Sequence, residues 1–76
     1  MEPEAQKALG VIAHARAVRQ GISQGRAVSE LYQGLSTKIM RANARSVLAR
    51  VAWEMPAAEA GASERARAAL AATAGA

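Results

Sequence analysis

Alanines and larger apolar residues recur every three or four positions along most of the chain, the spacing that places side chains on one side of an α-helix. The pattern predicts helices over residues 3–20, 23–33 and 36–55, and no stretch has the alternation typical of a strand. Pro3 suits the first position of a helix, and Gly21 should end the first one. We therefore expect an all-α fold, a small bundle of three to four helices.

The second and third predicted helices are joined by a short turn. Ser23 can cap the second helix, because its hydroxyl can accept a hydrogen bond from a free amide of the first turn. Gly34 is expected to end that helix in the left-handed conformation, with Leu35 packing back on it. Ser36 is expected to start the third helix, which meets no proline or glycine before Pro56 and should be unbroken.

The third predicted helix has two faces. Its apolar stripe should face a core and comprises Met40, Ala44, Val47, Leu48, Val51 and Met55. Lys38, Arg41 and Arg45 follow the same spacing about a quarter of a turn away, so they should stand in solvent as a row. Such rows are common on surface helices, and they are also what a helix needs to lie in the major groove of DNA.

Four short motifs surround the turn: GISQ at 21–24, RAV at 26–28, GLS at 34–36 and IMR at 39–41. Together they resemble the helix-turn-helix of phage-repressor-type and LuxR-type DNA-binding domains. The resemblance implies that the partner is double-stranded DNA. The implied contact residues are Gln24, Arg26, Ser36, Thr37, Lys38, Arg41 and Arg45.

Within this resemblance the contact residues have different roles. Gln24 and Arg45 would contact the DNA backbone, and Ser36 would cap the recognition helix. Base edges would be reached by Thr37, Lys38 and Arg41. The expected fold is therefore a bundle with a helix-turn-helix-like centre.

Size and charge narrow the function further. The chain has 76 residues and no cysteine, which limits it to one domain at most, with a thin core and no disulfide or thiolate metal site. Its formal net charge of +4 favours an anionic partner, nucleic acid first. Neither a signal peptide nor an apolar run of membrane-spanning length is visible, so we expect a cytoplasmic protein with no membrane partner.

The composition changes in the last third of the chain. Residues 1–55 form the predicted helical domain, 56–62 a linker of mostly small residues, and 63–76 a short alanine-rich helix or a frayed tail. Ser63 could cap such a helix, and Leu70 is its only large apolar anchor. The segment is interpreted either as a dimer-contact helix or as a solvated tail, and its lack of anchors favours the tail.

No arrangement of residues predicts catalysis or a cofactor. All six acidic residues are glutamates, scattered at helix ends and exposed positions. His14 is the only histidine, and the chain has no cysteine or aspartate to join it, so a surface histidine is favoured over a metal-binding or catalytic one. We expect neither an enzyme nor a bound cofactor.

Ile39 and Trp53 lie off the main apolar stripe and suggest a second contact surface. Because large apolar residues are few, the chain would gain stability from a partner. We therefore predict a homodimer with Trp53 at or beside its interface, and Leu70 is a further candidate contact.

Two functions are compatible with these patterns. The leading hypothesis is a small DNA-binding regulator that acts as a dimer through the recognition helix. The alternative is a small helical protein-interaction module, such as a phage-type inhibitor, adaptor or virion component. Such a module would bind a partner protein through a basic or Trp-bearing face.

Overall fold

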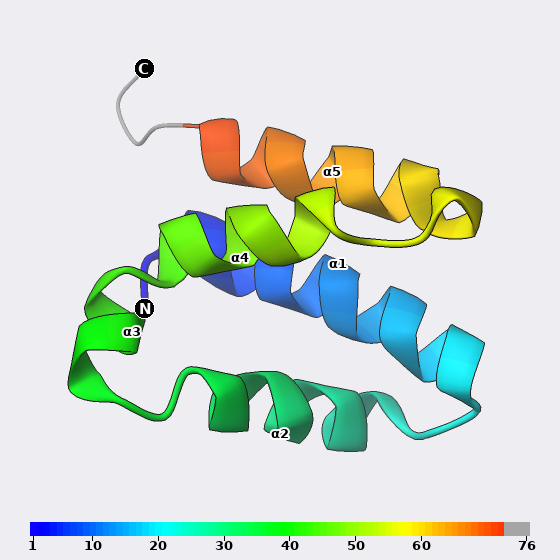
Figure 1. Ribbon diagram of the computed structural model, residues 1–76, viewed down its shortest axis with the longest axis horizontal. Coiled ribbons are helices and arrows are strands. Elements are labelled where there is room, and N and C mark those ends of the chain that lie inside the picture. The colour runs from blue at the N-terminus through cyan, green and yellow to red at the C-terminus, as the bar shows by residue number, and fades with distance from the viewer. Residues whose placement is uncertain (73–76) are drawn as a thin grey trace.

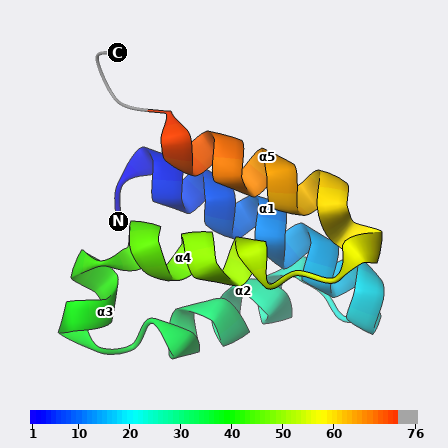
Figure 2. The same ribbon diagram turned by 45° about the horizontal axis from the view of Figure 1, so that its top comes forward.

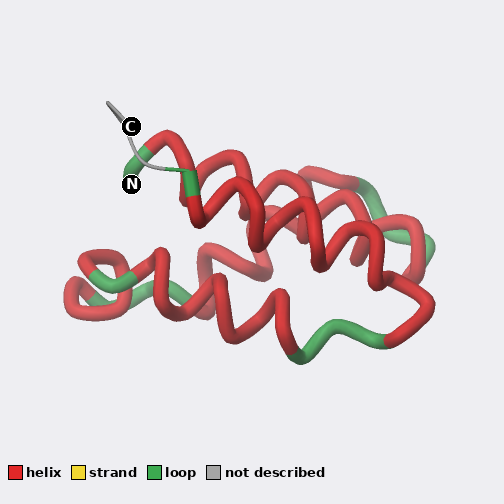
Figure 3. Tube along the Cα trace, turned by 90° about the horizontal axis from the view of Figure 1, so that it is seen from above, coloured by secondary structure: helices red, strands yellow, loops and turns green. Residues whose placement is uncertain are grey.

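The computed structural model describes residues 1–72, and every regular element within them is helical (Figure 1). In chain order these elements are α1 (Pro3–Gln20), α2 (Gln24–Gly34), α3 (Lys38–Ala42), α4 (Ala44–Trp53), the 3₁₀ turn η1 (Ala57–Glu59) and α5 (Ala60–Ala71). Short connections join them (Figure 3). The predicted all-α bundle is confirmed. None of the helices in residues 1–72 has the length and apolar character needed to cross a bilayer.

The longest helix, α1, is the centre of the bundle, because α2, α4 and α5 all pack against it (Figures 1 and 2). With three neighbours, α1 buries residues around much of its circumference. Its buried residues are Ala5, Ala8, Leu9, Ile12, Ala13 and Ala17. Most of them are alanines, whose small side chains let neighbouring helices come close to the α1 backbone.

The first two helices begin where predicted. α1 ends at Gly21, which adopts the left-handed conformation with φ 66°. The hydroxyl of Ser23 accepts the backbone N–H of Arg26 at 3.1 Å and so caps α2. The left-handed conformation predicted for Gly34 is wrong, because its φ is not positive. α2 ends instead through Leu35 (φ −106°, ψ 27°), whose side chain is buried in the core.

The prediction of one helix over residues 36–55 is wrong, because Asn43 divides it into α3 and α4. The backbone of Asn43 (φ −106°, ψ 25°) departs from helical values, and its Nδ2 donates to the carbonyl oxygen of Ile39 at 3.1 Å. Asparagine side chains compete with the helix for backbone partners in this way. A single asparagine thus ends a stretch that has neither proline nor glycine.

The predicted core face of α4 is confirmed. Ala44 and Leu48 are buried, and the partly buried members of the predicted stripe are Met40, Val47, Val51 and Met55. Ala52 is buried as well, although the stripe did not include it. The largest fully buried side chains of the protein are Ile12, Leu35 and Leu48.

Of the two interpretations of the C-terminal segment, a short alanine-rich helix and a frayed tail, the structure has the helix, α5. η1 and α5 begin inside the predicted linker 56–62, and Ser63 is not a cap but a buried residue within α5. Its Oγ donates to the carbonyl oxygen of Ala52 at 2.6 Å. Leu70 is only 5% exposed and packs in the chain's own core, which leaves little of its side chain free for the predicted partner contact. Residues 73–76, where we expected fraying, lie outside the described residues.

Candidate interaction surfaces

The residues expected to read DNA bases lie at the start of α3, a helix of five residues. Thr37, not the predicted Ser36, caps it: the Thr37 hydroxyl accepts the backbone N–H of Met40 at 3.1 Å. Lys38 and Arg41 are exposed, and α3 buries no residue. A recognition helix lies along the major groove with its first residues on the bases. α3, the helix in this position, has only five residues before the chain leaves the helical conformation at Asn43.

Arg45 does not stand in solvent as predicted. Its Nη2 lies 3.1 Å from a carboxylate oxygen of Glu2 and 3.7 Å from one of Glu4, so it ties the start of α4 to the N-terminal segment. Arg41 also bends back, because its Nε donates to the carbonyl oxygen of Leu35 at 3.3 Å. The predicted cationic row is therefore divided between two helices, and one of its members is engaged by acidic side chains.

Gln24 and Arg26 lie at the other end of α2 from the turn (Figure 1). Oε1 of Gln24 is 3.4 Å from Nδ1 of His14, and Nε of Arg26 is 3.4 Å from a carboxylate oxygen of Glu30. A helix of 11 residues is about 16 Å long. The predicted nucleic-acid contacts thus occupy two places separated by the length of α2.

Trp53 stands on the surface of α4 and is 70% exposed. The guanidinium of Arg67 in α5 lies over its ring, 4.0 Å from the ring centroid. Arg67 is held in turn, because its Nε donates to Oγ of Ser63 at 3.3 Å, and this same Oγ donates to the carbonyl oxygen of Ala52. The bond between Arg67 and Ser63 within α5, and the bond from Ser63 to α4, thus hold Arg67 over the ring. We name Trp53 and Arg67 the Trp53–Arg67 platform.

The surface predicted to join Ile39 with Trp53 assumed a single helix. Because Asn43 divides that helix, Ile39 belongs to α3 and Trp53 to α4. Ile39 is 75% exposed, as the prediction required, but it lies on a different helix from the platform. Arg67 was not predicted, and no local spacing links it to a tryptophan 14 positions earlier.

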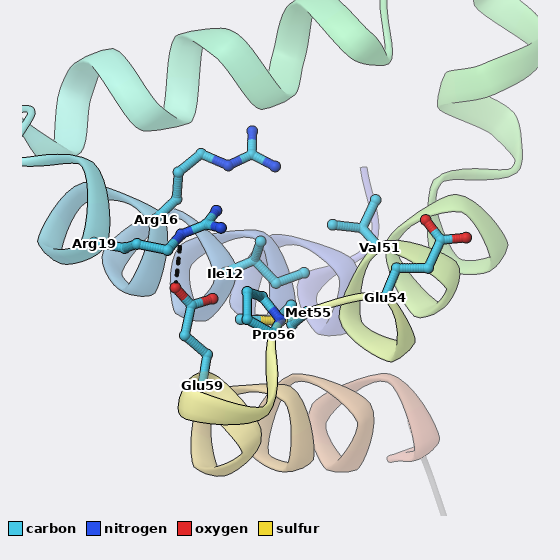
Figure 4. Close-up of a pocket in the computed structure, with 8 residues that line it drawn as sticks. All are labelled: Ile12, Arg16, Arg19, Val51, Glu54, Met55, Pro56 and Glu59. Atoms are coloured by element: carbon cyan, nitrogen blue, oxygen red, sulfur yellow. Dashed lines mark ion pairs between the residues drawn. The ribbon is translucent and has the colours of Figure 1, made fainter.

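A groove crosses α1 between α2 and α4 and continues toward η1. It consists of two adjoining hollows that share Arg16 and Val51. The first hollow, of about 280 Å³, has an apolar floor of Ile12, Met55 and Pro56 (Figure 4). The second, of about 220 Å³, is bounded mainly by Leu31, Leu35, Val47 and Leu48. Nothing in the sequence marks this groove, because its residues come from helices far apart in the chain.

The charged residues of the groove differ in their partners. Arg19 pairs with Glu59 at 2.9 Å, and Glu30 is engaged by Arg26. Arg16 is half-buried, yet it has neither an ion pair nor a side-chain hydrogen bond within residues 1–72. In Figure 4 its side chain extends from α1 toward α2, away from the Arg19–Glu59 pair. Arg16 is thus an unpaired cation at the point where the two hollows meet.

No three His, Cys, Asp or Glu side chains in the described part of the chain are placed to hold a metal ion. No family model matches this chain, and no curated protein or solved structure matches it. The helix-turn-helix resemblance therefore depends on the four sequence motifs alone.

Proposed function

We propose that the protein is a small helical protein-interaction module that contacts a partner protein through the Trp53–Arg67 platform. The observation that carries the proposal is that the chain's only tryptophan is 70% exposed and covered on one face by an arginine. Tryptophan and arginine are the residue types that contribute most to binding energy in protein interfaces. An exposed indole contributes little to the stability of the isolated chain, whereas burying it against a partner is strongly favourable.

The rigidity of the platform supports the same proposal. Binding costs free energy when side chains lose rotamer freedom, and that cost is smaller where the side chains are already held. The Ser63 hydroxyl bonds the backbone of α4 and positions Arg67, and Arg67 stacks on Trp53. Both residues also stand on helices rather than on loops, which favours a fixed geometry.

Self-association is one form of this function. A second copy could cover Trp53, and the homodimer predicted from the shortage of large apolar residues remains a prediction. Light scattering at high micromolar concentration measures the mass directly. A Trp53→Ala variant should be monomeric wherever the wild-type protein is dimeric.

DNA binding is the second candidate function. It is favoured by the net charge of +4 and by the exposure of Lys38 and Arg41 beside the Thr37 cap. The shortness of α3 and the pairing of Arg45 with two glutamates weigh against it as the first choice. Phosphate contacts are strongest at low salt, so a duplex titration at about 50 mM salt is its most favourable test.

The protein-interaction proposal is tested by selecting peptides from a random displayed library on immobilised wild-type protein. Each selected peptide is then titrated against two variants. Trp53→Ala should weaken binding by about 30-fold, the size of a typical interface hot spot. Val18→Ala is the matched control, because Val18 is also an exposed large apolar residue, 72% exposed, but lies on α1. It should change the affinity less than about twofold.

Two outcomes would overturn the proposal. One is a set of selected peptides that bind Trp53→Ala as tightly as they bind the wild-type protein. The other is a protein that selects no peptide but binds a DNA duplex at low salt, with loss of binding in Lys38→Ala or Arg41→Ala. The second outcome would establish the DNA-binding function instead.

A further inference from the structure

We infer that the groove between α2 and α4 binds a small monocarboxylate with an apolar tail, and that Arg16 holds its carboxylate. The site is independent of the proposed protein interaction. The Trp53 ring contacts Arg67 of α5, whereas the second hollow is bounded by α2 and by Val47 and Val51 of α4, and Trp53 lines neither hollow. Loss of one site therefore does not imply loss of the other.

Arg16 is the basis of the inference. Its guanidinium is always charged, and a half-buried charge without a counter-ion is unfavourable. Arg16 lines both hollows of the groove and has no ion pair within the described residues. The planar guanidinium matches a carboxylate, with which it can form two parallel hydrogen bonds. A carboxylate at the junction of the hollows would supply the missing partner.

The acidic residues of the groove limit the charge of the ligand. Glu59 is engaged by Arg19, and Glu30 by Arg26, so neither neutralises Arg16. Glu54 is exposed and lies across the pocket from Arg16 in Figure 4. These carboxylates would repel a second negative charge, since like charges at close range are unfavourable. A monocarboxylate therefore suits the site better than a dicarboxylate or a phosphate.

The remaining lining determines the rest of the ligand. The second hollow, of about 220 Å³, is bounded by aliphatic side chains that include Leu31, Leu35 and Val47. Pockets for drug-sized ligands are about 300 to 1,000 Å³, so this hollow suits a smaller molecule. An alkyl chain extending from the carboxylate at Arg16 would lie between α2 and α4 and bury its methylene groups there.

The test is a titration of the ¹⁵N-labelled protein with sodium octanoate, followed by amide chemical shifts. The amides of Leu31, Leu35 and Val47 should shift, and the side-chain indole N–H of Trp53 should not. Hexanoate has two fewer methylene groups and should bind about tenfold more weakly. Octan-1-ol has the same chain without the charge, so it should bind at least about tenfold more weakly than octanoate.

Variants separate the role of Arg16 from that of the groove. Arg16→Gln should weaken octanoate binding by about tenfold or more, because a charged hydrogen-bonding group is lost. Arg50→Gln is the matched control: it removes an exposed arginine of α4 outside the groove and should leave octanoate affinity unchanged. Glu30→Gln should tighten binding by removing a nearby negative charge.

Three results would overturn the inference: no shift of the groove amides with octanoate, equal affinity for octan-1-ol and octanoate in the wild-type protein, or unchanged affinity in Arg16→Gln. Of these, the comparison with octan-1-ol needs no variant, so it holds even if a substitution impairs folding. Loss of Trp53 would leave octanoate binding intact, which distinguishes this site from the platform.

Discussion

Helix α5 consists mostly of alanine and charged residues, and yet it buries a full side of itself, whereas α3 contains an isoleucine and a methionine and buries no residue. The difference comes from what each helix lies against. α5 packs along α1, whose buried residues are also mostly alanines, so the two helices approach closely and exclude water. Burial therefore depends on the fit between two helices more than on the size of the side chains in one.

The length of each helix adds to this contrast. α3 is confined to five residues between the Thr37 cap and the break at Asn43, too few to lay a stripe of side chains on the core. α5 has 12 residues and a buried hydrogen bond from Ser63 to α4. A longer helix can repeat small contacts along its whole face.

The largest expected effect on stability comes from a matched pair of substitutions, one in α5 and one in α3. Leu70→Ala in α5 should lower the free energy of unfolding by about 2 to 5 kcal/mol, because Leu70 is buried in the core. Ile39→Ala in α3 should change it by no more than about 0.5 kcal/mol, because Ile39 is exposed. Urea denaturation followed by circular dichroism measures both values. Similar losses for the two variants would show that α3 is as important to the core as α5.

A smaller effect is expected at the hydrogen bond that joins α5 to α4. Ser63→Ala should lower the free energy of unfolding by about 1 kcal/mol, since one buried hydrogen bond is lost. Ser46→Ala is the control, because Ser46 is exposed on α4. Ser63→Ala should also free Arg67 and make the Trp53 ring more mobile, which fluorescence anisotropy would detect. An unchanged anisotropy would mean that Ser63 does not hold the platform.

The smallest effect on stability is expected at the break between α3 and α4. Asn43→Ala removes the side-chain bond to Ile39 and replaces asparagine with a better helix former, so the stability should change by only about 0.5 kcal/mol. The helical signal in circular dichroism should rise as α3 and α4 join. If it does not rise, the packing of α4 on α1 sets the break, and the asparagine only accommodates it.

The features that the sequence predicted correctly are those fixed by neighbouring residues. The Ser23 cap and the Gly21 end of α1 depend on contacts within a few positions, and both are found as predicted. The all-α class and the core face of α4 follow from helical spacing in the same way. In contrast, the single predicted helix over 36–55 failed at Asn43, where the side chain bonds the carbonyl oxygen of Ile39. Helical spacing alone does not show such a bond.

The features that were missed depend on residues far apart in the chain. Arg45 was expected in solvent, but its partner Glu2 lies 43 positions away. The exposure of Trp53 was consistent with its predicted role as a contact, whereas its stacking with Arg67 depends on how α5 packs. The unpaired state of Arg16 likewise depends on three helices coming together. Such pairings are not visible in a single sequence.

We propose that the partner surface is the Trp53–Arg67 platform and not α3. This proposal is tested most directly by adding a selected peptide to the ¹⁵N-labelled wild-type protein and recording which resonances shift. The single tryptophan gives one indole N–H signal, so its assignment needs no further experiment. We predict that this signal and the amides around Arg67 shift, while those of Lys38 and Arg41 do not. Shifts confined to Lys38 and Arg41, with an unchanged indole signal, would contradict the account.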